Sequence, residues 1–366
     1  MKKLPWSELH QGFSAVLSSV NNIETVISYG NVLAEHESIT GRAALIDLSH
    51  RTRIRVTGHA AAYDFLQRIF TNDIPRPGSF KCCYTFMLNP QGNIITDAFV
   101  FNWGDSYIID AEAGMVDKLL DKLTSQASND INVSDASGSV GILTIQGPIA
   151  QDILEAWLLG EELPADVFSA VKIILPDGKD VLIINNPRTG TGGFDIIADV
   201  ESGPLIVRRL FKILGALDCR LAGWQAFDIA RFEAGIPRFG SDIDPSVIAT
   251  ETGLAEKAIS STKTDFVGFD VISRHSNPNS MNSYLRGLRL FNDIQVLPQK
   301  GDLLEYDDQV VGYITSSLAS PKFHANLAFG YISKDFNKIG NILTLRSMNF
   351  ESPAQIVELP FSKNFV

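Results

Sequence analysis

The stretch from Ala230 to Asp244, ARFEAGIPRFGSDID, alternates charged residues with bulky apolar ones, and two glycines and a proline interrupt it. The residues before Gly235 suit the end of a helix, and glycine adopts at little cost the left-handed conformation that ends one. Pro237 then fixes one backbone torsion and Gly240 frees another. We therefore expect a helix that stops near Gly235 and a stiff, irregular loop after it.

The charged side chains of this loop need partners, because its apolar residues favour burial. One interpretation is an ion pair between Arg231 and Glu233, Asp242 or Asp244, which would hold the loop in place.

Length and composition describe an ordinary globular protein with more than one domain. The chain has 366 residues, of which 45% are hydrophobic and 20% charged, so two or three domains are expected. Its net charge of −11 argues against a general nucleic-acid or anionic-membrane surface, since both require a positive footprint. A local basic pocket for one acidic small molecule remains compatible with this charge.

The three cysteines, Cys82, Cys83 and Cys219, form neither a disulfide framework nor a zinc motif, so we expect buried, reduced thiols and no structural metal. The N-terminus has two lysines without an apolar run after them, and no apolar run reaches membrane-spanning length. A cytoplasmic location without a membrane partner is the expectation.

Periodicity predicts intermixed helices and strand pairs, which indicates the α+β class. Expected helices are Trp6 to Val20, Ala60 to Phe70, Met115 to Leu123, Ile149 to Trp157 and Pro204 to Leu214; expected strands are Ala44 to Leu48, Thr52 to Val56, Cys82 to Leu88, Ile94 to Phe101, Tyr107 to Ile109, Val140 to Ile145, Val171 to Leu175, Val181 to Ile184 and Phe194 to Ala198.

The segment RHSNPNSMNSY, Arg274 to Tyr284, lacks apolar periodicity and is expected to be a linker or long loop. Short strands with turns between them follow, which is typical of a small β-barrel. These strands are Leu285 to Phe291, Leu303 to Tyr306, Gln309 to Ser316, Asn326 to Ile332 and Ile342 to Arg346.

Several motifs in the same order resemble the glycine-cleavage T-protein (aminomethyltransferase) family, which includes YgfZ-type folate-binding proteins. Besides the opening stretch they are SYGNVLAEHESITGRAALIDLSH (Ser28 to His50), FLQRIFTNDI (Phe65 to Ile74), MLNPQGNIITD (Met87 to Asp97), LTIQGP (Leu143 to Pro148), GYITSSLASP (Gly312 to Pro321) and LAFGYI (Leu327 to Ile332). The resemblance implies a three-domain cloverleaf with tetrahydrofolate in a central channel. We place the domains at residues 1–135, 136–275 and 276–366, the last being the β-barrel.

The resemblance also implies candidate site residues. Where aminomethyltransferases have two adjacent aspartates, this chain has Thr96 and Asp97, and threonine cannot serve as a carboxylate base. Asp97 is the candidate catalytic residue, and a strand residue held by a local hydrogen bond is the alternative. Tyr107 matches a tyrosine that packs near folate, although a half-buried strand tyrosine fits equally well.

The segment NPRTGTGGFDI, Asn186 to Ile196, lacks the family's pterin-binding glutamate and is similar to a YgfZ segment. It offers Arg188 and Asp195, of which Asp195 could replace the pterin carboxylate or be a plain strand residue. Arg231 matches an arginine at the family's folate site, and would bind folate by a charge-assisted hydrogen bond instead of pairing internally. Glu251 matches a glutamate of both branches.

Two functions follow from the resemblance. The first is tetrahydrofolate-dependent one-carbon transfer, aminomethyl or methyl, with folate and a lipoyl carrier protein as partners. The alternative is a non-enzymatic, YgfZ-like role in iron–sulfur cluster assembly or repair, with iron–sulfur proteins as partners. The cysteine of YgfZ proteins is absent, since Asp265 stands at its place. A family member that has lost folate is a third possibility.

Overall fold

The computed structural model describes residues 1–275, 280–291, 296–348 and 350–362. The chain divides into two compact units. The first contains Met1–Thr85 and Asp97–Ala230, and the second contains Phe86–Thr96 and Arg231–Val366.

The first unit begins with a short helix and a β-hairpin. Helix α1 covers Ser7–Gln11, and strands β1 (Val16–Val20) and β2 (Ile23–Ser28) pair antiparallel. The predicted helix from Trp6 to Val20 is therefore wrong beyond Gln11. Asn21 and Asn22 both have positive φ angles, 49° and 63°, as the tight turn of a hairpin requires.

A five-stranded sheet in the order β5-β6-β7-β4-β8 carries many of the candidate residues. Its strands are β4 (Thr52–Thr57), β5 (Cys82–Leu88), β6 (Ile94–Trp103), β7 (Ser106–Ala111) and β8 (Asn132–Asp135), with helices α3 (His59–Ile69) and α4 (Val116–Thr124) between them in the chain. Every residue of β7 is buried, so a charged residue on this strand must find its partner inside the protein.

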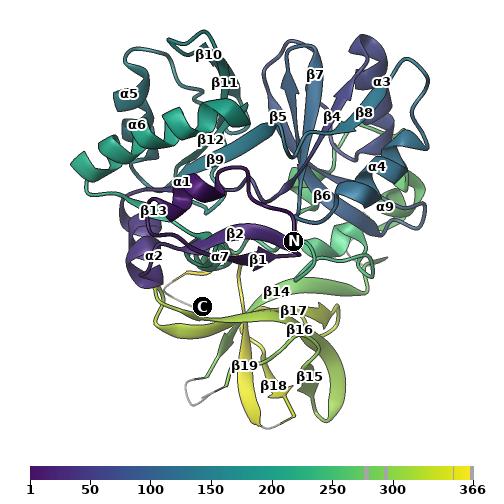
Figure 1. Cartoon of the computed structure of the whole chain (residues 1–366). Helices are drawn as coiled ribbons and strands as arrows, with labels where there is room; N and C mark the ends of the chain where they lie inside the picture. Colours follow the sequence, from purple (N-terminus) through teal and green to yellow (C-terminus); the bar gives the residue numbers. More distant parts are fainter. Residues whose placement is uncertain (276–279, 292–295, 349, 363–366) are drawn as a thin grey trace. The chain divides into compact units, whose positions relative to one another are not determined.

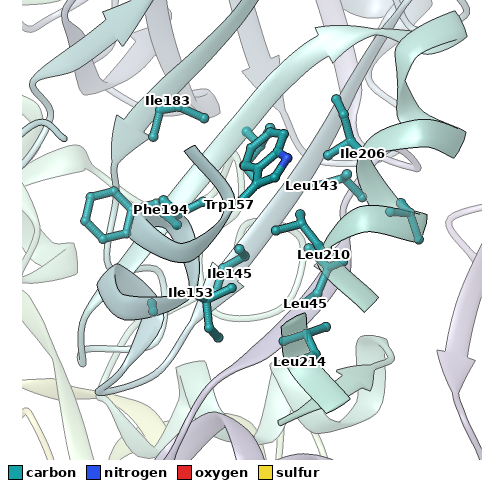
Figure 2. Packing of buried hydrophobic residues seen from close by; sticks show 14 of the residues in the cluster. Leu45, Leu143, Ile145, Ile153, Trp157, Ile183, Phe194, Ile206, Leu210 and Leu214 are labelled. Atoms are coloured by element: carbon teal, nitrogen blue, oxygen red, sulfur yellow. The ribbon is translucent and has the colours of Figure 1, made fainter. Parts of the chain in front are cut away.

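A six-stranded sheet in the order β10-β11-β12-β9-β3-β13 forms the rest of the first unit's framework. Its strands are β3 (Ala44–Asp47), β9 (Val140–Gln146), β10 (Ala170–Ile174), β11 (Asp180–Asn185), β12 (Gly193–Asp199) and β13 (Arg220–Ala222). Helices α5 (Ala150–Leu158) and α6 (Gly203–Ala216) bury Trp157 and Leu210 against Leu143 and Ile145 of β9 (Figure 2). Burial of these side chains accounts for the helical periodicity in both segments.

The remaining elements before the barrel are short. They are α2 (Val32–Gly41), the 3₁₀ turns Val200–Ser202 and Ala249–Thr252, α7 (Trp224–Glu233), α8 (Ala255–Ala258) and α9 (Phe269–His275). Helix α7 ends two residues before Gly235, whose φ is 72°, which confirms the predicted helix end. The predicted linker, Arg274 to Tyr284, begins in α9 and ends in strand β14 (Ser283–Leu290), and residues 276–279 lie outside the described residues.

The second unit contains a closed six-stranded barrel, drawn in light green to yellow in Figure 1. Its strands, β14-β17-β16-β15-β18-β19 in spatial order, are β14 (Ser283–Leu290), β15 (Leu303–Tyr306), β16 (Gln309–Ser320), β17 (Ala325–Ser333), β18 (Ile342–Arg346) and β19 (Glu351–Val357). The α+β class and the C-terminal barrel are therefore confirmed. The sequence prediction missed β19, which contains Pro353.

Candidate active site

Asp97 lies on β6 as a half-buried carboxylate with a defined hydrogen-bond partner. The hydroxyl of Tyr84 on β5 donates to Asp97 Oδ2 at 2.8 Å. Burial raises the pKa of Asp97 above its ordinary value, while the Arg51 guanidinium and the Tyr84 hydrogen bond oppose this rise. A carboxylate whose pKa is raised in this way is better suited to proton transfer near neutrality than an ordinary aspartate.

Thr96 and Asp97 point to opposite faces of β6, as adjacent strand residues must. Thr96 is fully buried, whereas Asp97 and Phe99 are half-buried. Tyr84 and Phe99 have ring centroids 5.1 Å apart, so the half-buried face of β5 and β6 combines two aromatic rings with one carboxylate.

Asp110 on β7 is the centre of a buried ionic network that the motifs did not reveal. Its side chain is fully buried and accepts from Arg51 Nε at 2.7 Å and from Arg188 Nη2 at 2.8 Å. Arg51 also lies 3.4 Å from Glu112. Burial alone would raise the pKa of Asp110, but the two guanidinium groups hold it below its ordinary value. Asp110 is therefore an ionised structural counter-ion rather than a proton donor.

Arg188 and Asp195, both predicted from the sequence, bind each other. Arg188 donates through Nε to Asp195 Oδ1 at 2.9 Å and through Nη2 to Oδ2 at 2.8 Å, and Asn186 also donates to Oδ2 at 2.8 Å. The Arg188 guanidinium lies 4.3 Å from the centre of the Phe99 ring. Asp195 is almost fully buried and both of its oxygens accept bonds, so its role as a replacement pterin carboxylate stays a prediction.

Tyr107 is buried on β7, and its hydroxyl donates to the carbonyl oxygen of Pro75 at 2.8 Å. Asp110 lies on the same strand and belongs to the ionic network, but the hydroxyl of Tyr107 bonds to Pro75 and takes no part in that network. A direct contact between Tyr107 and folate stays a prediction.

In the second unit, Arg231 forms the internal ion pair weighed from its sequence. Arg231 Nη1 donates to Asp242 Oδ2 at 3.0 Å and to the Ile236 carbonyl at 2.9 Å. Asp242 also accepts from the Arg238 backbone N–H at 2.9 Å and the Thr315 hydroxyl at 2.9 Å, and from Ser316. These bonds tie the loop after α7 to β16, which explains why a loop rich in charges is stiff.

Two glutamates of the second unit also have hydrogen-bond partners there. Glu233 Oε1 accepts from the Ser320 hydroxyl at 2.5 Å and from the Lys322 backbone N–H at 3.0 Å. Glu251, in the 3₁₀ turn Ala249–Thr252, accepts from the Ser283 backbone N–H at 3.2 Å. Binding of a ligand by Arg231 or Glu251 stays a prediction.

The residues that sequence reasoning missed are Arg51, Tyr84 and Asp110. One signal was available: charged residues directly next to predicted strands, Arg51 before TRIRV and Asp110 after YII, need internal partners if those strands are buried. Among the described residues, no group of three or more His, Cys, Asp and Glu side chains is placed to hold a metal ion. The helices of the described ranges also include none that is long and apolar enough to cross a membrane.

These features define an α+β protein with a closed terminal barrel and an ionic ligand-site candidate in its first unit. Two family models match the chain. The GCVT N-terminal domain covers residues 6–263, and the glycine cleavage T-protein C-terminal barrel domain covers residues 284–363. The chain belongs to the glycine cleavage T-protein family.

Similar proteins match over almost their whole length. An aminomethyltransferase of Halalkalibacterium halodurans is 26% identical, with 99% of this chain and 98% of that protein aligned. One from Caldanaerobacter subterraneus is 27% identical, with 99% and 96% aligned. The crystal structure of glycine cleavage system aminomethyltransferase T from Bartonella henselae has the same fold, with a TM-score of 0.86, 22% identity, and 99% of this chain and 98% of that chain aligned.

Proposed function

We propose that the protein is a tetrahydrofolate-dependent aminomethyltransferase. Family membership supports this, and so do full-length relatives that carry that name. The YgfZ-like accessory role has no comparable support, because the relatives described above are named for the transferase. In this proposal tetrahydrofolate accepts the one-carbon unit, and a lipoyl carrier protein carries the aminomethyl group that is transferred.

The observation that carries the proposal is the environment of Asp97. It is an ionisable, half-buried carboxylate with a raised pKa, and Tyr84 fixes its orientation. When bound, tetrahydrofolate supplies the nitrogen that takes up the one-carbon unit. Asp97 Oδ1 or Oδ2 would hold or accept the proton that is exchanged at that nitrogen, and Arg51 would stabilise the carboxylate form by its positive field.

We propose that a pterin-like ring binds at the half-buried face of β5 and β6. The rings of Tyr84 and Phe99 offer apolar surfaces, and Asp97 would accept hydrogen bonds from N–H groups of the bound ring. Asp195 does not fit as a free acceptor, because Arg188 and Asn186 already donate to it. We therefore assign Arg188 and Asp195 to positioning the Phe99 side of the site, where the guanidinium packs on the ring.

In the second unit, Arg231 and Glu251 are proposed as further ligand contacts. The loop that carries Arg231 is held by Asp242, so a ligand would meet a preorganised side chain at no cost in loop ordering.

Isothermal titration and thermal unfolding with tetrahydrofolate test the binding part of this proposal. We expect heat release and an increase of Tm that grows with ligand concentration. Asp97→Asn should still bind, because an asparagine oxygen can accept from Tyr84, and Asp105→Asn, at an exposed turn residue, is the matched control. Neither heat nor thermal protection with the wild-type protein would contradict both the transferase and any other folate-dependent role.

A further inference from the structure

Arg53 on β4 is a fully buried arginine whose guanidinium is bonded to backbone carbonyls. Its Nη1 donates to the Arg51 carbonyl at 2.7 Å, and its Nη2 donates to the Ser49 carbonyl at 2.8 Å and to the Ser137 carbonyl at 2.6 Å. Within the described parts of the chain, none of the ion pairs includes Arg53. Its side chain therefore connects the turn at residues 49–51 to the turn after β8.

A buried guanidinium without a carboxylate partner costs several kcal/mol of desolvation, which hydrogen bonds must offset. Burial lowers the pKa of Arg53 to about 10, so the group is still charged at neutral pH. A neutral side chain could connect two turns at a smaller cost. The charge and the geometry of Arg53 therefore call for an explanation beyond packing.

The position of Arg53 supplies that explanation. In the antiparallel pairing of β4 with β7, Arg53 lies directly opposite Asp110, so both side chains are on the same face of the sheet. Asp110 is nevertheless bonded to Arg51 and Arg188. Arg53 instead donates to the carbonyls of Ser49 and Arg51, and Asp47 Oδ1 accepts from the Ser49 backbone N–H at 2.7 Å.

We propose that Arg53 is a positioning residue that acts through Arg51. By holding the carbonyls of Ser49 and Arg51, it fixes the point from which the Arg51 side chain reaches Asp110 and Glu112. The positive charge of Arg51 lowers the pKa of Asp97. The hydrogen bond from Tyr84 also lowers it, whereas the negative charge of Asp110 raises it. The role of Arg53 in catalysis rests on the proposed function, in which Asp97 exchanges a proton with the folate nitrogen. Its effect on the position of Arg51 does not depend on that function.

The test is a double-mutant cycle read out on Asp97 in the ligand-free protein. The side-chain carboxyl signal of Asp97 is titrated by NMR in the wild-type protein, Arg51→Met, Arg53→Lys and the double variant. His50 lies in the turn at residues 49–51, and burial lowers its pKa to about 3. Its charge therefore stays unchanged in the pH range above that value in which Asp97 is titrated. Arg55→Lys is the matched control, since Arg55 is the next residue on the same face of β4 and is half-buried.

We expect Arg51→Met to raise the pKa of Asp97 and Arg53→Lys to shift it in the same direction. In the Arg51→Met background, Arg53→Lys should add no further shift, and Arg55→Lys should leave the titration unchanged. A shift by Arg53→Lys that persists without Arg51, or no shift at all, would overturn the proposal.

A second variant covers the case in which Arg53→Lys does not fold. Ser137→Ala removes the hydroxyl that accepts from the Arg53 backbone N–H at 3.0 Å and leaves every charge in place. It keeps the Ser137 carbonyl that Arg53 Nη2 binds, so it acts by loosening the backbone from which the Arg53 guanidinium reaches the carbonyls of Ser49 and Arg51. An upward shift of the Asp97 pKa that depends on Arg51 supports the proposal, and an unchanged titration contradicts it. Because no folate is added, this result is independent of whether the protein is a transferase.

Discussion

At the residue scale, Asp97 is under two opposing influences. Burial raises its pKa, while Arg51 and Tyr84 lower it, and the net effect is a raised pKa. A carboxyl group whose pKa is higher in the folded state binds its proton more tightly there than in the unfolded chain. Its contribution to stability is therefore present at low pH and is lost as the pH rises through the pKa of the folded state.

Asp97→Asn should remove the loss of folding stability that accompanies ionisation of Asp97. Above the folded-state pKa of Asp97 we expect the variant to be as stable as the wild-type protein or more stable by about 0.5–2 kcal/mol, and the difference should shrink as the pH falls below that pKa. Urea unfolding at a series of pH values measures it. A variant that is less stable at high pH would show that the carboxylate is a net stabilising partner of Arg51.

Asp110 should be far more important for stability than Asp97. Asp110→Asn would leave Arg51 and Arg188 buried without their shared counter-ion, and breaking a buried ion pair costs about 3–5 kcal/mol. Asp105→Asn changes the same chemical group at an exposed turn and should change the free energy of unfolding by less than about 0.5 kcal/mol. Equal effects of the two substitutions in urea unfolding would contradict the network described above.

The sequence indicated which polar side chains belong to the candidate site, but it did not indicate which of them bind each other. Arg188 and Asp195 were identified as polar groups of one segment, and the structure joins them to each other. Asp110 is 78 positions from Arg188 along the chain, and only the arrangement of the sheets brings the two together. Pairings of this kind depend on strand order and register, which single-sequence patterns do not contain.

At the element scale, wrong predictions had local causes. The residues Val16 to Val20 were assigned to a helix although VLSSV is followed by two asparagines, which accept the positive φ angles of a hairpin turn. Strand β19 was missed because Pro353 interrupts ESPAQIV. Proline cannot donate to a ladder, so it lowers any strand prediction. In β19, Pro353 still pairs with Thr344, and its carbonyl accepts from the Phe291 N–H at 3.3 Å.

The loop after α7 gives a prediction about two glycines of similar conformation. Gly235 and Gly240 have φ angles of 72° and 85°, so alanine is strained at both. A methyl group at Gly235 would also meet the Pro360 Cα at 2.9 Å, whereas nothing lies within 4 Å of the one at Gly240. We expect Gly240→Ala to cost about 1 kcal/mol and Gly235→Ala about 1–3 kcal/mol more.

Thermal and urea unfolding of the two alanine variants compare these costs directly. Because both changes carry the backbone penalty, their difference isolates the steric conflict with Pro360. Equal destabilisation would mean that the C-terminal segment near Pro360 moves aside without cost.

At the scale of the whole molecule, ordered motifs predicted more than any single motif. Matches from Ser28 to Ile332 in family order indicated the family and its terminal barrel, and both are confirmed. Five of the six barrel strands were predicted, because short alternating runs separated by turns are typical of small all-β domains. The two boundaries between the three predicted domains, after residues 135 and 275, stay predictions.

The proposed function makes its sharpest claim about Asp97. The most direct measurement is the rate at which methylene-tetrahydrofolate forms from an aminomethyl group on a lipoyl carrier protein, with wild-type protein and Asp97→Asn at saturating tetrahydrofolate. We predict that the rate of product formation rises in proportion to the concentration of the wild-type protein. The rate with Asp97→Asn should be lower by about 10²–10⁴-fold. No product with a wild-type protein that binds tetrahydrofolate, or equal rates for the two proteins, would contradict the account.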